Sequence, residues 1–354
     1  MKKNRLILIL LFGLTALLLS ACTGAGQTNS WAGVTAADEY VYYANGNLVY
    51  ALDSKSGNTA WEYPQKASAQ RLFYAEPALA GEQLIVVDYA HGMTSLNAKT
   101  GAETWSFEDA KGRYIDSPLI LNDLIIAPNT DGSMYAVNLS GNSVWTFKTG
   151  QALWARPVSD GKTIFFTSMD KNFYAVDAAS GELRWKTDLK ISAVARALLE
   201  NDTLYVGNLD GALFAINAAD GSILWEQKVG GGIWAAPLLH EGKLYVGDQS
   251  GRINILDSAD GKVLQYIETE SSILGAGVLL ENGVAFGNEA GELIVIGFNG
   301  ERLWTRTFDG NLYSNIQKNG ENLLLTLTQG EKPLIAVDLN GNEIWNFSVK
   351  SDKK

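Results

Sequence analysis

A short stretch of sequence returns eight times along this chain at a nearly constant interval. In "AVDAASGELRW", residues 175–185, two strand-like runs flank a turn that contains Ser180 and Gly181. The eight copies end at positions 61, 105, 145, 185, 225, 265, 304 and 345, so the steps between them are 44, 40, 40, 40, 40, 39 and 41 residues. Self-similarity at a period of about 40 residues predicts a repeat architecture, with one supersecondary unit in each repeat.

Each unit contains four short apolar runs separated by turn signals. In residues 237–266 the runs start at positions 237, 244, 253 and 263, and glycine with aspartate or glutamate marks the turns between them. Glycine accepts a positive φ and aspartate caps a turn, so these runs are typical of short antiparallel strands. No segment keeps a 3.6-residue hydrophobic period, so helices are not expected. The sequence therefore predicts an all-β fold, an eight-bladed β-propeller of four-stranded antiparallel blades, over residues 31–350.

The two ends of the repeat region each hold the signals of a whole blade. Residues 31–63 contain one full set of four strand signals, and residues 308–350 contain another. We therefore expect the first and last blades to meet as complete sheets, with no strand exchanged between them.

A tryptophan ends seven of the eight copies, four residues after the turn glycine in most of them. An indole at this position is placed to cover the hairpin of a neighbouring unit and would bury about 150–250 Å². We interpret these residues as structural staples and not as cofactor contacts: Trp61, Trp105, Trp145, Trp185, Trp225, Trp304 and Trp345. Gln265 ends the sixth copy, so we expect the seam beside it to be weaker or to be packed by Tyr266.

The segment before the repeats has the layout of an export signal. Three basic residues precede an apolar run of 14 residues, which is too short to span a bilayer. The run ends in "LLSAC", which resembles the lipobox of bacterial lipoproteins, and Cys22 is the sole cysteine. We expect residues 1–21 to be a signal peptide, Cys22 to carry lipid, residues 22–30 to be a flexible tether and residues 351–354 to be a short tail. An ordinary signal peptide that happens to precede a cysteine is the alternative.

The charge of the chain limits its partners. Removing residues 1–21 takes away three basic groups, so the formal net charge changes from −11 to −14. A basic face is needed to bind phosphates, so no nucleic-acid partner is expected. We expect a monomeric propeller that contacts the membrane only through lipid on Cys22, on the outer membrane if the organism has one and otherwise on the outer face of the cytoplasmic membrane.

The repeat pattern also resembles a known family. The spacing Ala-x-Asp-x-x-x-Gly-x-x-x-Trp, preceded by strands such as "GKLYVG" and "DGALFAI", is similar to the repeat of the pyrroloquinoline-quinone-type β-propellers, over about nine tenths of the chain. That repeat occurs in quinoprotein dehydrogenases, in binding domains of exported proteins and in an eight-bladed lipoprotein of the outer-membrane β-barrel assembly machinery. Similarity to the lipoprotein in lipobox, blade count and length implies a non-catalytic scaffold for other envelope proteins.

A quinone-dependent dehydrogenase is the less favoured alternative. The resemblance implies that such an enzyme uses an adjacent pair of cysteines and a carboxylate and amide set around Ca²⁺, whereas this chain has Cys22 alone. The polar residues before the turns follow the repeat and are interpreted as caps and not as metal ligands: Asp53, Asn97, Asp177 and Asp257. The two histidines, His91 and His240, lie in different units, which disfavours a zinc site or a Ser-His-Asp arrangement. We expect no catalytic residue, no metal and no cofactor.

The candidate site is formed by positions at which the aligned repeats carry different residues. One column reads "WAGV", "YAEP", "IDSP", "WARP", "VARA", "WAAP", "LGAG" and "YSNI", and in a propeller it approaches one mouth of the central channel. The candidate binding funnel is Trp31, Tyr74, Glu76, Trp154, Arg156, Arg196, Trp234, Tyr313 and Asn315. Two arginines in neighbouring blades would repel each other unless an anionic group, from Glu76, a ligand or a partner, lies between them. Binding of a small molecule or glycan is the alternative function, and channel lining is the structural alternative.

Overall fold

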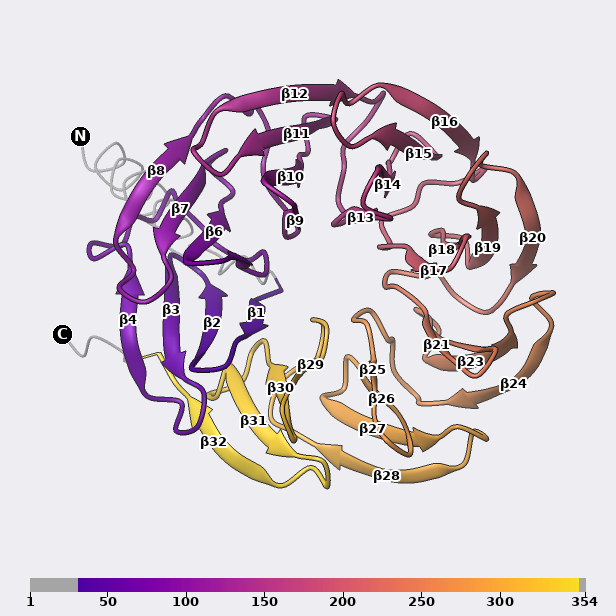
Figure 1. Ribbon diagram of the computed structural model, residues 1–354. Coiled ribbons are helices and arrows are strands. Elements are labelled where there is room, and N and C mark those ends of the chain that lie inside the picture. Colours follow the sequence, from indigo (N-terminus) through magenta and orange to yellow (C-terminus); the bar gives the residue numbers. More distant parts are fainter. Residues whose placement is uncertain (1–30, 350–354) are drawn as a thin grey trace, which may run out of the picture. The chain divides into compact units, whose positions relative to one another are not determined.

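The computed structural model describes residues 31–349, which form a closed ring of eight four-stranded antiparallel sheets without helices. In every blade the four strands follow each other in sequence order, with the first strand nearest the axis and the fourth at the rim (Figure 1). The predicted all-β, eight-bladed propeller is thereby confirmed. The interpretations of residues 1–30 and 350–354, including lipid on Cys22, lie outside the described residues.

The strands of the first four blades are β1 (Gly33–Ala36), β2 (Tyr40–Asn45), β3 (Leu48–Asp53) and β4 (Thr59–Tyr63); β5 (Ala78–Ala80), β6 (Gln83–Val87), β7 (Met93–Asn97) and β8 (Glu103–Phe107); β9 (Leu119–Leu121), β10 (Leu124–Pro128), β11 (Ser133–Asn138) and β12 (Ser143–Lys148); and β13 (Val158–Ser159), β14 (Thr163–Thr167), β15 (Asn172–Asp177) and β16 (Leu183–Asp188). Those of the last four are β17 (Leu198–Glu200), β18 (Thr203–Gly207), β19 (Ala212–Asn217) and β20 (Ile223–Lys228); β21 (Leu238–His240), β22 (Lys243–Gly247), β23 (Arg252–Asp257) and β24 (Val263–Glu268); β25 (Val278–Leu279), β26 (Gly283–Gly287), β27 (Glu292–Gly297) and β28 (Arg302–Thr307); and β29 (Gln317–Asn319), β30 (Asn322–Thr326), β31 (Leu334–Asp338) and β32 (Glu343–Phe347).

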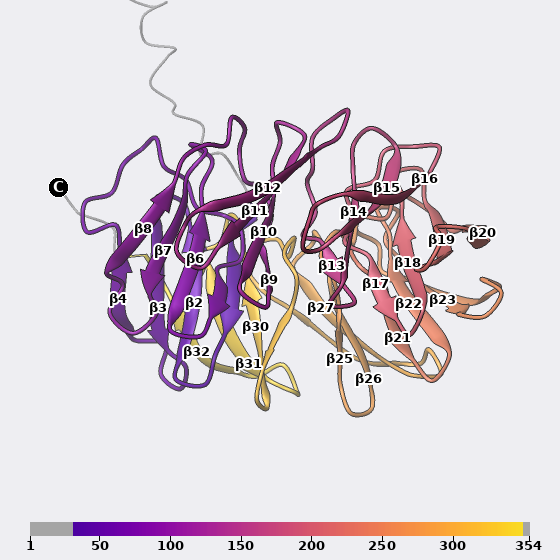
Figure 2. The same ribbon diagram turned by 45° about the horizontal axis from the view of Figure 1, so that its top comes forward.

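The ring has two faces, between which the strands run (Figure 2). Because successive strands are antiparallel, the loop that enters the first strand of a blade and the end of its fourth strand lie on one face, which we call the mouth face. The turns between first and second strands lie on the opposite face, which we call the far face. The part of the chain that the structure describes contains no helix with the length and apolarity needed to cross a membrane.

The hydrophobic core lies in the seams between blades. Each of the eight buried clusters joins side chains of two neighbouring sheets, because the middle strands are apolar on both faces. In the closing seam Tyr43 of the first blade packs edge-on against Phe347 of the last, with ring centroids 5.9 Å apart. β1 pairs with β2 alone, so the expected closure by whole sheets is confirmed.

Each staple tryptophan contacts the blade that follows its own, across the seam between the two blades. Six indoles donate a hydrogen bond of 2.9 to 3.1 Å to a carbonyl in the turn of the next blade: Trp61, Trp105, Trp145, Trp185, Trp225 and Trp345. The indole lies on the turn glycine, so a Cβ at Gly261, which has a φ of +75°, would come within 2.6 Å of Trp225. Glycine is required there both by its backbone conformation and by this close approach. Each of these indoles therefore packs against the turn of the neighbouring blade.

Two seams depart from this pattern. Gln265 itself lies on Gly300 and donates a 3.4 Å hydrogen bond to its carbonyl, whereas Tyr266 is 51 % exposed. The expected alternative of packing by Tyr266 was therefore wrong, because the adjacent side chain on a strand points to the opposite face. In the following seam Trp304 packs against Gly341 and lies 6.0 Å from the guanidinium of Arg306.

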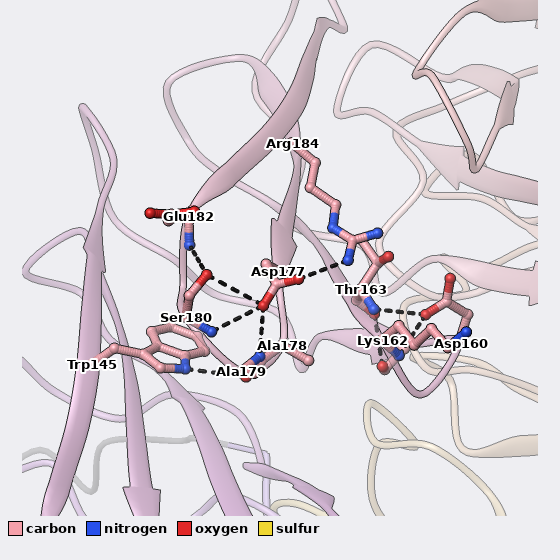
Figure 3. Close-up of polar contacts among 11 residues, drawn as sticks. Trp145, Asp160, Lys162, Thr163, Asp177, Ala178, Ala179, Ser180, Glu182 and Arg184 are labelled. Carbon is pink, nitrogen blue, oxygen red and sulfur yellow. Dashed lines mark hydrogen bonds and ion pairs between the residues drawn. The ribbon is translucent and has the colours of Figure 1, made fainter.

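The polar residues before the turns act as caps, as their repetition predicts. Figure 3 shows Asp177, whose Oδ1 accepts hydrogen bonds from the backbone N–H groups of Ala179 and Ser180, both at 2.9 Å. Its other oxygen accepts a 2.7 Å hydrogen bond from Arg184. Trp145 of the preceding blade donates to the Ala178 carbonyl in the same turn, so the cap also holds the staple's acceptor in place. Asp53, Asn97 and Asp257 cap their own turns in the same way.

Candidate functional site

The funnel residues lie in the loops that lead into the innermost strands on the mouth face. They surround a cavity of about 600 Å³ at the channel. The cavity is lined by Trp31, Tyr74, Glu76, Trp154, Arg196, Trp234, Tyr313 and Asn315. Arg156 belongs to the same column but does not line this cavity; its Nε is buried, and its backbone N–H donates to Asp116 in the loop of the preceding blade.

Aromatic rings meet over the channel from blades that are distant in sequence. Trp31 lies edge-on to Trp234, with ring centroids 5.9 Å apart, and stacks on Tyr313 at 6.2 Å. Each of the two rings that contact Trp31 also makes one hydrogen bond. Trp234 donates to Gln249 at 3.4 Å, and Tyr313 donates to Glu289 at 2.9 Å. Burial and the bond to Glu289 raise the pKa of Tyr313, so its hydroxyl stays protonated. Tyr74 is buried and its ring packs edge-on to Tyr89, 5.1 Å away.

Four charged side chains from successive blades share the channel. Glu76 accepts hydrogen bonds from Asn315 at 2.8 Å and from Gln317 at 3.4 Å. Burial, reinforced by the nearby Asp116 carboxylate, raises the pKa of Glu76 despite these bonds and the two arginines. Partial burial of these groups strengthens the electrostatic interactions between them.

The charges of the two arginines disfavour each other. Burial lowers the pKa of Arg156, the positive charge of Arg196 lowers it further, and Glu76 and Asp116 oppose the change. The Nε of Arg156 is buried and has no hydrogen-bond partner. The structure therefore brings Arg156, Arg196 and Glu76 into one electrostatic group, and it leaves a donor of the group unused.

Asp116 is a member of this group that the sequence analysis did not single out. It accepts a 2.7 Å hydrogen bond from the backbone N–H of Arg156 and a second, also 2.7 Å, from that of Ser117. A signal for it was present, because Asp116 stands at the second position of the column, where most other units carry alanine.

The chemistry of this arrangement is recognition by charge and aromatic contact. The guanidinium of Arg196, two carboxylates and three clustered rings line the cavity and offer ionic, hydrogen-bonding and stacking contacts to a bound group. Residues 31–349 contain no group of three or more His, Cys, Asp or Glu side chains arranged to hold a metal ion. Elsewhere on the ring, His240 stacks on Phe298 at 3.6 Å and His91 lies exposed in a turn with a φ of +80°.

The chain is similar to known proteins both in sequence pattern and in fold. The family model described as "Outer membrane protein assembly factor BamB" matches residues 25–149 and 130–272. No curated protein matches the chain.

Among solved structures, the fold is similar to that of BamB from Moraxella catarrhalis, with a TM-score of 0.74, 16 % identity, and coverage of 86 % of this chain and 92 % of that one. It is also similar to the computationally designed Ika8 protein, with a TM-score of 0.76, 12 % identity, and coverage of 88 % and 96 %. A europium-containing methanol dehydrogenase gives a TM-score of 0.73, 12 % identity, and coverage of 83 % and 81 %. At these identities the likeness shows the shared propeller fold.

Proposed function

The chain belongs to the family of the outer membrane protein assembly factor BamB, and from this premise we propose that it is a non-catalytic scaffold that binds other envelope proteins during outer-membrane protein assembly. The observation that carries the proposal is the family match, which extends over residues 25–272. The lipobox-like "LLSAC" supports export and lipid attachment at Cys22. In this proposal the lipid on Cys22 holds the propeller near the membrane, and the tether leaves space between them for a partner.

The absence of catalysis is part of the proposal. Cys22, the sole cysteine, precedes the propeller, so the channel offers no cysteine pair to a quinone. The repeated polar residues, such as Asp53 and Asp177, use their oxygens to cap turns. A nucleophile beside a positioned base is the usual sign of covalent catalysis, and the charged side chains that line the cavity are one arginine and two carboxylates, Arg196, Glu76 and Asp116.

We place the partner's contact at the channel mouth. Arg156 retains an unused buried donor, and its charge and that of Arg196 disfavour each other. An acidic side chain of a partner that reaches Arg196, which lines the cavity, would relieve that repulsion and form a charge-assisted hydrogen bond.

The experiment is crosslinking in intact cells, with the captured proteins identified, for the wild type and for a variant carrying Arg156→Ala and Arg196→Ala. We expect a several-fold loss of capture with a nearly unchanged melting temperature, because no seam is held by these guanidinium groups. The matched control carries Lys162→Ala and Lys262→Ala, which remove the same charge from exposed positions in far-face turns and should leave capture unchanged. Full capture by a folded double-arginine variant would contradict a contact at the mouth.

A second candidate function is supported by the aromatic rings over the cavity. Trp31, Trp234 and Tyr313 surround a space of about 600 Å³, which is large enough for a sugar or a small carboxylate. Titration with small glycans and carboxylates, followed by tryptophan fluorescence, distinguishes this function from protein binding. A saturable change lost in Trp31→Ala would support it.

A further inference from the structure

The chain enters the propeller at the channel mouth, close to the axis. Trp31, the first residue that the structure describes, is held between Trp234 and Tyr313 of two other blades. The carbonyl of the next residue, Ala32, accepts a 2.9 Å hydrogen bond from Ser314. These contacts fix the start of the propeller on the mouth face and away from the rim.

The far face carries an acidic ring. Every turn between the first and second strands of a blade contains at least one exposed acidic side chain. The acidic ring consists of Asp38, Glu39, Glu82, Asp123, Asp160, Asp202, Glu241, Glu281 and Glu321.

Turn formation alone does not account for the acidic ring. Asp160 caps its turn by accepting from the backbone N–H groups of Lys162 and Thr163, at 2.8 and 2.6 Å. Glutamate does not share the turn preference of aspartate, yet it stands in several of these turns, and Glu241 is 85 % exposed as a side chain. The common property of the ring is its negative charge, which faces solvent at the end of the propeller opposite Trp31.

From these two features we propose that the propeller turns its mouth face toward the lipid surface that holds Cys22 and its acidic far face away from it. This inference rests on the proposed lipid anchoring. It goes beyond that proposal because it states which surface of the propeller meets the membrane.

The reach of the tether limits the alternatives. Nine residues lead from Cys22 to Trp31, and a fully extended chain of that length spans about 32 Å at most. To place the far face on the membrane, the tether would have to cross three strand spacings, about 14 Å, and then descend a five-residue strand, about 17 Å. The two distances together nearly equal the full reach of the tether, and side chains and turns lengthen the path further, so contact of the far face with the membrane requires a fully extended tether. With the mouth face toward the membrane, the distance from Trp31 to the lipid surface is shorter than the reach of the same tether.

Electrostatics favours the same orientation. Anionic lipid head groups give a membrane surface a negative potential that acts within about a Debye length, roughly 8–10 Å. The acidic ring would be repelled from such a surface, because lysines of the far face such as Lys162 offset only part of its charge. The mouth face carries more basic side chains among its acidic ones, such as Lys111, Lys171 and Lys190. The orientation with the acidic ring outward therefore has the lower electrostatic energy.

The test uses the full-length lipidated protein on vesicles of phosphatidylcholine and phosphatidylglycerol that contain a spin-labelled lipid. Lipid attachment consumes the thiol of Cys22, so a fluorophore can be placed on one new cysteine, from Asp109→Cys on the mouth face or from Asp202→Cys on the far face. Both positions are exposed and both substitutions remove one carboxylate. We expect quenching at position 109 to exceed that at position 202 several-fold. Insertion of 20 Gly and Ser residues within residues 23–30 should bring the two values closer without releasing the protein.

Flotation with the vesicles reports anchoring separately from orientation. Protein that floats but shows equal quenching at the two positions, or stronger quenching at position 202, overturns the orientation and leaves the anchoring intact. Protein that does not float overturns the proposed anchoring and this inference with it.

Discussion

At the scale of single residues, the side chain opposite each staple explains how the staple packs. Trp225 is paired across strands with Ala215, which leaves room for the indole to lie flat toward the next blade. Gln265 is opposite Ile255, and Trp304 is opposite Val295. The two seams with unusual packing are therefore those with a branched residue at the paired position.

The first prediction concerns Trp225. Trp225→Ala removes the indole that lies on Gly261 and donates to Ser258 at 3.0 Å. Because the side chain is half-buried, we expect the free energy of unfolding to decrease by an amount near the lower end of the range of about 3–5 kcal/mol. Urea denaturation measures the change. Leu224→Ala, an exposed neighbour on the same strand, serves as the control, and equal effects of the two substitutions would contradict the staple role.

A second prediction concerns acid stability. The hydrogen bond from Arg184 and the N–H groups of the turn lower the pKa of Asp177 to about 2. The pKa of an aspartate in the unfolded chain is about 3.9. The stabilisation is therefore complete above that pH and is lost as the pH falls through about 2. Asp177→Asn keeps a cap, as Asn97 shows, and removes the charge. We expect a shallower loss of stability from about pH 4 to 2.

Melting temperatures at several pH values measure this effect. At pH 7 the substitution should change the melting temperature little, because both partners of the ion pair are exposed and such pairs contribute weakly. An acid transition with unchanged slope would show that the pair does not form in solution.

At the scale of structural elements, the seams are the units that carry stability. Each cluster of buried side chains belongs to two sheets, so no blade has a core of its own. The seam between the sixth and seventh blades is held by the 3.4 Å bond of Gln265 in place of an indole.

The third prediction therefore concerns amide exchange. We expect the amides of β24 and of residues 298–301 to exchange with solvent faster than those of β20 and residues 258–261, because local opening of the weaker seam needs less free energy. Hydrogen-exchange mass spectrometry makes the comparison within one sample. The variant with Gln265→Trp and Ile255→Ala, which restores an indole and its small partner, should slow exchange in β24. Uniform rates over the two seams would refute the assignment of a weak seam.

Periodicity predicted the fold because every blade repeats the same solution. The spacing of Trp61, Trp105 and their equivalents fixed the number of units, and the turn glycines fixed their strands. The site was predicted less completely. The column located Arg156 and Arg196, but which side chains meet across the ring depends on loop conformation, so Asp116 became evident only in three dimensions.

At the scale of the whole molecule, the fourth prediction concerns anchoring. Cys22→Ser removes the proposed lipid attachment site without touching any residue of the ring, so the propeller should leave the membrane fraction and keep its melting temperature. Fractionation with and without detergent measures this. A Cys22→Ser variant that still requires detergent for release would contradict the lipoprotein assignment.

The forward direction of the staples has a further consequence for assembly. Each indole reaches from one blade to the turn of the next, and Trp345 completes the circuit by donating to Ser54 of the first. Such a head-to-tail contact is heterologous, so it forms a closed object only when the rotation per unit adds up to a full turn. A gene duplication or deletion that changes the blade number would leave one donor edge and one acceptor edge unmatched. Unless the remaining blades adjusted their tilt, those edges would pair between molecules, and the opened ring would become the repeating unit of a filament.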